Sequence, residues 1–156
     1  MRAVLWSLVF STSILNIICN AVIHDLSLNS PETYLSSPNN DNTTYFKFVI
    51  KEIIPDEDLA VIVRPADFKS DPDVFISERN PYPSPQINDQ ACFQYGYDVC
   101  FIPKERLAIN KIFYIAVNCP QGTCKFHISV LYAEENLLTF NQTFEYYYQE
   151  KGNLKK

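Results

Sequence analysis

An acidic motif in the middle of the chain has the residue types that a hard cation needs. The motif is Asp71-Pro72-Asp73, and Asp67, Glu78 and Asn80 place further side-chain oxygens nearby in the sequence. Calcium takes several carboxylate and carbonyl oxygens that converge from a loop, so Asp71 and Asp73 are candidate ligands of an optional calcium ion. The alternative is a plain turn in which the proline fixes φ and the aspartates bond nearby backbone. The sequence lacks the D-x-[DN]-x-[DN]-G run of a dedicated calcium loop, which favours the turn.

Catalytic chemistry finds no comparable pattern in the sequence. The two histidines, His24 and His127, fall near the start of the expected domain and on the polar face of an expected strand, where surface histidines are common. Adjacent carboxylates at 56–58 and 134–135 lie in segments typical of solvated turns. The sequence contains no G-x-S-x-G elbow, H-E-x-x-H motif or glycine-rich phosphate loop. We therefore predict that the protein is not an enzyme.

Four of the five cysteines form two closely spaced pairs. The pairs have the spacings C-x7-C, for Cys92 and Cys100, and C-x4-C, for Cys119 and Cys124. Four cysteines allow three pairings, and we predict the two local disulfides, Cys92–Cys100 and Cys119–Cys124. A zinc site is the alternative, but the wider spacing does not fit the short C-x-C knuckles of structural zinc sites. Disulfides of this kind are typical of an oxidising compartment.

The first 21 residues have the three-part layout of a secretory signal peptide. Arg2 supplies a positive charge, residues 3–18 form a mostly apolar run without charge, and Cys19 and Ala21 place small residues before a cleavage point. Cleavage after Ala21 also removes Cys19, which leaves an even number of cysteines. An uncleaved membrane anchor is the alternative, although the run is shorter than the roughly 20 apolar residues that span a bilayer.

We predict a signal peptide at residues 1–21, one domain at residues 22–148 and a polar tail at residues 149–156. Sequons at Asn42 and Asn141 predict N-glycosylation, which is a modification of secreted proteins. No second long apolar segment follows the first, so we expect no transmembrane span after signal cleavage. These features together predict a secreted or cell-surface protein.

The overall composition restricts the partners of the protein. The formal net charge is −5, and an acidic surface does not suit nucleic acid or an anionic membrane. Hydrophobic residues make up 47% of the chain, and the 11 phenylalanines and 10 tyrosines favour strands. We therefore expect an extracellular protein or a glycan as partner, and a monomeric protein.

Short alternating runs separated by turn residues predict an all-β fold. In residues 45–50, Phe46, Phe48 and Ile50 share one face, and residues 111–117 form an apolar run that is typical of a central strand. We expect residues 111–132 to form a hairpin that the second disulfide closes. Further strands are expected at 22–28, 59–64, 73–77, within 92–102, at 137–140 and at 144–148, with loops at 30–42 and 80–90 and a helical turn at 104–107. About seven or eight short strands predict an antiparallel β-sandwich or jelly roll.

Residues 44–132 resemble the pre-peptidase C-terminal domain family, whose members are small β-sandwich modules of secreted proteins and of protozoan surface proteins. The resemblance rests on Tyr-Phe-Lys-Phe at 45–48, on Asp-Pro-Asp-Val-Phe-Ile-Ser at 71–77, on the proline-rich segment that follows, and on the pattern of 115–130. Two features depart from the family pattern, because Ser70 replaces the usual glycine and no protease domain precedes the module. The resemblance implies a non-catalytic binding or surface module with calcium as an optional ligand.

These observations predict a non-catalytic, secreted or cell-surface β-sandwich module for binding or adhesion. The first alternative is a secreted carrier of an apolar ligand such as a lipid, which requires a cavity between the sheets. The second alternative is a small hydrolase, which requires two convergent acids in a cleft. A glycan could stack on tyrosines such as Tyr82, Tyr95 and Tyr97, but tyrosine in strands more often packs with its hydroxyl at the rim.

Overall fold

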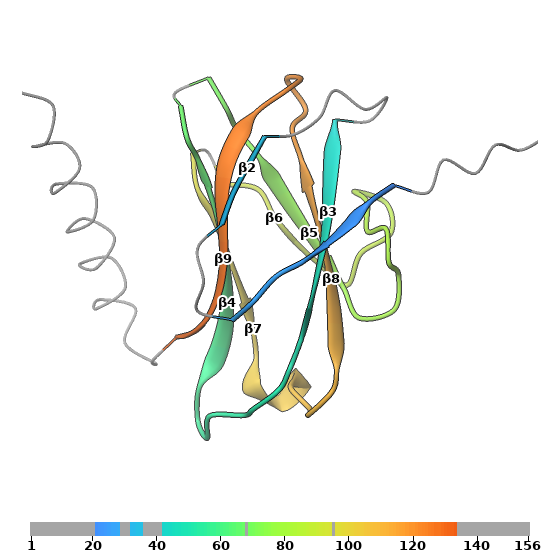
Figure 1. Ribbon diagram of the computed structural model, residues 1–156, viewed down its shortest axis with the longest axis vertical. Helices are drawn as coiled ribbons and strands as arrows, with labels where there is room; N and C mark the ends of the chain where they lie inside the picture. Colours follow the sequence, from blue (N-terminus) through green and yellow to red (C-terminus); the bar gives the residue numbers. More distant parts are fainter. Residues whose placement is uncertain (1–20, 29–31, 36–41, 68, 95, 134–156) are drawn as a thin grey trace, which may run out of the picture.

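The computed structural model describes residues 21–28, 32–35, 42–67, 69–94 and 96–133, which fold as a β-sandwich of two sheets (Figure 1). One sheet has five strands in the order β1-β3-β8-β5-β6, and the other has four in the order β2-β9-β4-β7. The strands are β1 (Ile23–Asp25), β2 (Glu32–Leu35), β3 (Thr43–Val49), β4 (Asp58–Pro65), β5 (Asp73–Ser77), β6 (Gln90–Cys92), β7 (Asp98–Ile102), β8 (Ile112–Asn118) and β9 (Lys125–Ala133). Paired strands are antiparallel except β1 and β3, which run parallel. The predicted fold class is confirmed.

Alternation along the strands places the hydrophobic core between the two sheets. In β3, Phe46 and Phe48 point inward together with Ile50 just beyond the strand, as their spacing predicts. The apolar run of 111–117 forms β8, which lies in the centre of the five-stranded sheet. In β9, the alternating residues Phe126, Ile128 and Val130 are fully buried. Each fully buried side chain of this size contributes roughly 1.5–3 kcal/mol to folding.

The predicted hairpin over residues 111–132 is wrong. Strand β8 pairs with β3 and β5, whereas β9 pairs with β2 and β4, so the chain crosses from one sheet to the other between them. The disulfide Cys119–Cys124 closes this crossing, with Cα atoms 5.9 Å apart. Both arrangements need apolar residues on alternate positions of the two strands, which is why the sequence pattern did not distinguish them.

The other predicted disulfide, Cys92–Cys100, is also present, and it joins the two sheets. Cys92 ends β6, an edge strand of the five-stranded sheet, and Cys100 lies in β7, an edge strand of the four-stranded sheet. Although its two cysteines are close in the sequence, this bond therefore links the two layers of the sandwich. Beside it, the side-chain amide of Gln90 donates to the carbonyl oxygen of Phe101 at 2.9 Å, which adds a second link between these edges.

Two predicted loops differ in part from the structure. Residues 30–42 were expected to lack a strand, yet Glu32–Leu35 forms β2 at the edge of the four-stranded sheet. Residues 80–90 do form a loop, but Pro83 is buried and the ring of Tyr82 packs edge-on against Tyr45, 5.2 Å between centroids. The proline-rich loop therefore covers part of the outer face of the five-stranded sheet. The helical turn predicted at 104–107 is confirmed as a short 3-10 helix, η1 (Lys104–Arg106).

Several predictions fall outside the described residues. They are the signal peptide up to residue 20, the late strands at 137–140 and 144–148, the polar tail at 149–156, the carboxylates at 134–135 and the sequon at Asn141. Within the described ranges, no helix is long and apolar enough to cross a membrane.

Candidate binding site

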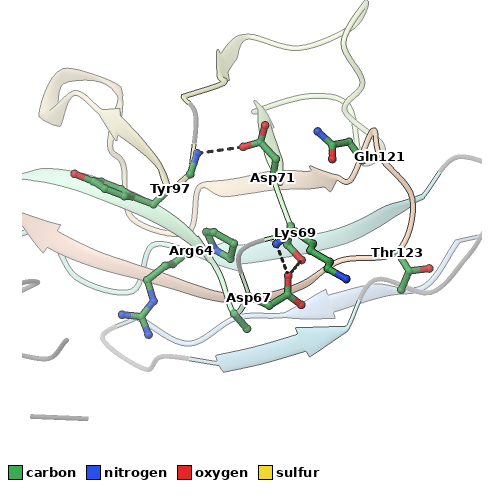
Figure 2. A pocket seen from close by; sticks show the side chains of 11 residues that line it. Arg64, Asp67, Lys69, Asp71, Tyr97, Gln121 and Thr123 are labelled. Carbon is green, nitrogen blue, oxygen red and sulfur yellow. Dashed lines mark hydrogen bonds between the residues drawn. The ribbon is translucent and has the colours of Figure 1, made fainter. Parts of the chain in front are cut away.

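Three connections between strands meet at one end of the sandwich and line a pocket of about 780 Å³. We call this the pocket end; it lies at the top of Figure 1. The connections join β4 to β5, β6 to β7, and β8 to β9. The lining residues are Arg64, Pro65, Ala66, Asp67, Lys69, Ser70, Asp71, Gly96, Tyr97, Gln121 and Thr123 (Figure 2). The lining includes polar and charged side chains of both signs together with apolar surface, such as that of Pro65 and Ala66.

The β4–β5 connection is held by the side chain of Asp67. Its Oδ1 accepts hydrogen bonds from the backbone N–H of Lys69 at 3.0 Å and from the hydroxyl of Ser70 at 2.8 Å (Figure 2). The hydrogen bond from Ser70, followed by that from Lys69, lowers the pKa of Asp67. The Ser70 oxygen also accepts from the backbone N–H of Lys125, which ties this connection to the start of β9. These hydrogen bonds link Asp67, Ser70 and the start of β9 on one side of the pocket.

The β6–β7 connection is held by two other aspartates. Asp71 Oδ1 accepts from the backbone N–H of Gly96 at 3.1 Å, and Asp98 Oδ1 accepts from the backbone N–H of Gln94. Gly96 has a φ of +100°, a conformation that residues with a Cβ rarely adopt. Figure 2 shows Asp71 directed at this connection beside Tyr97. One loop of the pocket thus depends on carboxylates from β7 and from the segment before β5.

Asp98 is a buried carboxylate at the pocket end of the core. It is 0% exposed, and its Oδ2 has no hydrogen-bond partner among the described residues. Burial raises the pKa of Asp98 to about 6, and the negative charges of Asp73 and Asp71 add to this rise, whereas backbone N–H groups of Gln94 and Val74 oppose it. The sequence analysis did not single out Asp98. The alternation of β7, in which Cys100 and Ile102 face inward, places Asp98 inward too and could have identified it.

The structure brings together only part of the predicted calcium site. The negative charges of Asp71 and Asp73 both raise the pKa of Asp98, and the pKa of Asp73 is raised by burial and then by the charge of Asp71. Glu78 and Asn80 lie at the opposite end, because β5 carries the chain away from the pocket end. Among the described residues, no three His, Cys, Asp or Glu side chains form a group that could hold a metal ion.

Two exposed aromatic side chains lie between the cysteines of the Cys92–Cys100 disulfide in the sequence. Phe93 is 66% exposed and Tyr97 is 46% exposed, and both belong to the β6–β7 connection. The ring of Phe93 leans toward Phe75 on the outer face of the five-stranded sheet, 6.1 Å between centroids. Tyr97 lines the pocket on the other side of the loop. Tyr82, which was weighed together with Tyr97 in the sequence, packs instead on Tyr45 away from the pocket.

The two histidines do not belong to the pocket lining. The ring of His24 packs against the contacting rings of Tyr34 and Phe46, with centroids 5.1 Å and 5.6 Å away. His127 stands opposite Arg64 on β9, at a position that alternates with the buried Phe126 and Ile128 and so faces outward. Neither histidine is among the residues that line the pocket.

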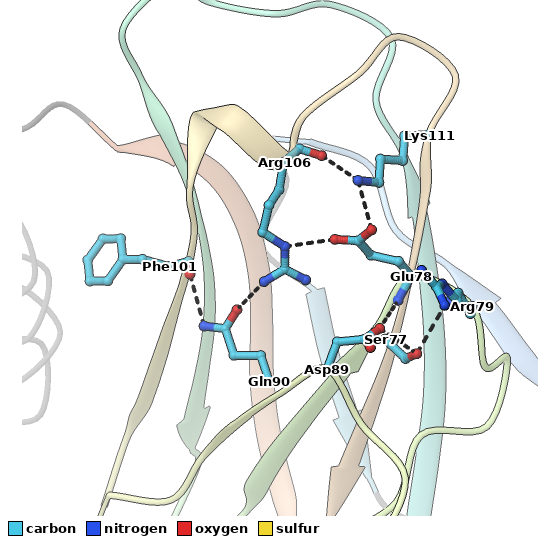
Figure 3. A network of polar contacts seen from close by, with 8 residues as sticks. All are labelled: Ser77, Glu78, Arg79, Asp89, Gln90, Phe101, Arg106 and Lys111. Atoms are coloured by element: carbon cyan, nitrogen blue, oxygen red, sulfur yellow. Dashed lines mark hydrogen bonds and ion pairs between the residues drawn. The ribbon is translucent and has the colours of Figure 1, made fainter.

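The opposite end of the sandwich is closed by a polar network (Figure 3). Glu78 accepts from Arg106 Nε at 2.7 Å and pairs with Lys111 Nζ at 2.8 Å. The hydrogen bond from Lys111 is the largest cause of the lowered pKa of Glu78. Asp89 accepts from the Ser77 hydroxyl and from the backbone N–H of Glu78. Sequence analysis missed this network, since its members are far apart in the chain.

Comparison with known proteins identifies the fold. No family model matches the chain, and no curated protein matches its sequence. The pre-peptidase C-terminal domain of a collagenase from Bacillus anthracis matches in structure with a TM-score of 0.52 and 12% identity, over 70% of this chain and 95% of that domain. A periplasmic inhibitor of g-type lysozyme from Aeromonas hydrophila matches with a TM-score of 0.40 and 10% identity, over 71% of this chain and 97% of that protein. The protein is therefore a β-sandwich with the fold of a pre-peptidase C-terminal domain, as the sequence motifs predicted.

Proposed function

We propose that the protein is a non-catalytic, secreted or cell-surface module that binds its partner at the pocket end. The observation that carries this proposal is the pocket itself, which three connections line with charged and polar side chains. Loops held by a rigid scaffold are common binding sites. Here the scaffold is two packed sheets that a disulfide links at their edges.

The lining of the pocket supports binding over catalysis. Its described residues include no histidine and no cysteine, and the Ser70 hydroxyl already bonds to Asp67 and Lys125. A hydrolase needs a nucleophile or water beside a base that a third group orients. The two acids of the lining, Asp67 and Asp71, instead accept hydrogen bonds from the backbone of the loops.

The core supports a binding module over a carrier of an apolar ligand. The space between the sheets is occupied by side chains of one continuous cluster, in which Phe46, Phe48, Phe113 and Phe126 are almost completely buried. A carrier needs a cavity of several hundred cubic ångströms in this region. The pocket in this structure lies among connections at the end of the sandwich.

Calcium is a further part of the proposal, with Asp71 and Asp73 as its ligands. The buried Asp98 supports it, because its Oδ2 has no hydrogen-bond partner among the described residues and a cation would offset the repulsion between its charge and those of Asp71 and Asp73. Thermal melting with calcium in excess and with chelator tests this part. We expect a higher Tm with calcium that is lost in the Asp73→Asn variant. An identical Tm in both conditions would remove calcium from the account.

Binding to cells of the source organism tests the main proposal. The secreted protein is labelled with a fluorophore, and its binding to cells and their secreted matrix is measured with unlabelled protein as competitor. We expect saturable binding that Lys69→Glu weakens, because this change reverses a charge in the pocket lining. The matched control is Lys51→Glu, an equal charge change at an exposed position away from the pocket. Absence of saturable binding, or equal loss in both variants, would contradict the proposed site.

A further inference from the structure

The outer face of the four-stranded sheet carries apolar side chains where polar ones are expected. An antiparallel sheet that packs one face on the core normally presents polar residues on the other face. Because Val61 of β4 belongs to the core between the sheets, its neighbours Ala60 and Ile62 face outward. We use the name outer patch for the five apolar residues that gather there, which are Ala60, Ile62, Val99, Phe101 and Leu131.

The outer patch is continuous across three strands. Ala60 stands opposite Phe101 of β7 and Leu131 of β9, and Ile62 stands opposite Val99 of β7. Ala60 and Ile62 are 0% and 1% exposed, whereas the other three residues are half-buried. Figure 3 shows the ring of Phe101 directed away from the five-stranded sheet. Single apolar residues at a surface are ordinary, but a contiguous patch indicates a contact surface.

The described residues cover the apolar outer face of one sheet and leave that of the other to the strands themselves. On the five-stranded sheet, Tyr45 and Phe75 form an outer cluster, and Tyr82 of the proline-rich loop packs on Tyr45. Against Ala60 and Ile62, the described hydrophobic side chains come only from the neighbouring strands β7 and β9. A cover for the outer patch must therefore come from other residues of the chain or from another molecule.

The chain itself supplies an apolar segment at the edge of the outer patch. Strand β9 ends at Ala133, two residues beyond Leu131 of the patch. Residues 134–156 follow directly and lie outside the described residues. We use the name apolar segment for residues 137–148, which contain Leu137, Leu138, Phe140, Phe144, Tyr146, Tyr147 and Tyr148.

The other stretches outside the described residues do not offer a comparable cover. Residues 29–31 and 36–41 contain only serine, proline, asparagine and aspartate. Residues 1–20 belong to the predicted signal peptide, which cleavage removes. Among the stretches longer than one residue, the apolar segment is therefore the one that remains with large apolar side chains.

Length and attachment favour the apolar segment over a separate molecule. The row from Leu131 through Ala60 to Phe101 crosses two strand spacings, which is about 10 Å. Residues 137–148 extend about 18 Å even in the compact form of a helix, so they reach across this row in any backbone conformation. A segment joined to the edge of the patch by a short linker has a local concentration in the millimolar range. It therefore competes effectively against a second copy or a free partner.

We propose that the apolar segment packs against the outer patch and closes the outer face of the four-stranded sheet. The patch is then buried within one chain, which protects the secreted protein from self-association through this face. The inference goes beyond the proposed binding function and does not depend on it, because the outer patch and the pocket lining share no residue.

A double-mutant cycle in the full-length secreted protein tests this packing by thermal melting. Phe101→Thr removes a ring from the outer patch, and the segment variant Phe140→Ser/Phe144→Ser removes two rings from the apolar segment. We expect each to lower the Tm by about 3–6 °C, and their combination to melt close to the lower of the two, because both remove the same contact. The matched control is Phe93→Thr, at a 66% exposed phenylalanine that leans toward the other sheet. Its effect on the Tm is expected to add to that of the segment variant.

The same melting curves show when the inference fails. Additive losses for Phe101→Thr and the segment variant, or an unchanged Tm in the segment variant, would overturn it. A wild-type Tm that rises with protein concentration would assign the outer patch to a second copy and also overturn it. Leu131→Thr takes the place of Phe101→Thr in the cycle if the latter does not fold. Binding to cells is measured separately, so the proposed function and this inference can fail independently.

Discussion

Replacing Asp98 by asparagine is expected to stabilise the protein at neutral pH. Asparagine keeps the acceptor oxygen for the Gln94 N–H and removes a charge that is buried beside Asp71 and Asp73. The folded protein holds the Asp98 proton more tightly than the unfolded chain does, since burial raises the pKa from 3.8 to about 6. The contribution of protonated Asp98 to the free energy of unfolding is therefore fully present below about pH 4, and it is lost as the pH rises through about 6.

The size of this effect follows from the two pKa values. The difference between 3.8 and about 6 corresponds to roughly 3 kcal/mol of stability that the wild type loses as the pH rises from about 4 to about 6. The buried side-chain NH2 group of the new asparagine would lack a hydrogen-bond acceptor, and this cost offsets part of the gain in stability. We therefore expect Asp98→Asn to be more stable than the wild type by about 1–3 kcal/mol at pH 7, and to lose this advantage by pH 4.

Urea denaturation at several pH values between 4 and 8 measures the difference between the two proteins. The matched control is Asp56→Asn, at a side chain that is 88% exposed and pairs with Lys104 at the surface, where an ion pair contributes little to stability. We expect the control to change the pH profile little. Equal stability of wild type and Asp98→Asn at pH 7, or parallel pH profiles, would refute the burial of a high-pKa carboxylate at the pocket end.

Two further predictions concern the rest of the chain. Glu78→Gln removes the negative charge that pairs with both Arg106 and Lys111, at a side chain that is only 24% exposed. We expect urea denaturation at pH 7 to show that the free energy of unfolding falls by about 1–2 kcal/mol. The lowered pKa of Glu78 means that this loss fades as pH falls below the unfolded pKa, and a pH-independent loss would contradict the ion pairs. Mass spectrometry of the secreted, unreduced protein is expected to show an N-terminus at Val22 and glycans at Asn42 and Asn141. An N-terminus at Met1 would favour the membrane-anchored alternative.

Local sequence patterns predicted the strands because alternation reports which side chains face the core. The faces of β3 and β9 and the bounds of β5 were predicted in this way. Pairing between strands was harder, because β8 and β9 show the same alternation whether they form a hairpin or lie in opposite sheets. Strand β2 was missed because its four residues lie among turn-forming residues.

The candidate site was predicted only in part, for a geometric reason. Glu78 and Asn80 are close to Asp73 in sequence, but a strand advances about 3.3 Å per residue and carries them to the far end. Asp98 is 25 residues from Asp73 along the chain, yet the two charges interact, because β7 brings Asp98 to the same end. The exposure of Phe93 depends on how the two edge strands meet, which no local pattern encodes.

The central claim is that the pocket end binds an extracellular partner. Its most direct test is saturable binding of the labelled, secreted protein to cells of the source organism, compared between wild type, Lys69→Glu and Lys51→Glu. The account predicts saturable binding by the wild type and by Lys51→Glu, and clearly weaker binding by Lys69→Glu. Binding that never saturates, or that is the same in all three proteins, would contradict it.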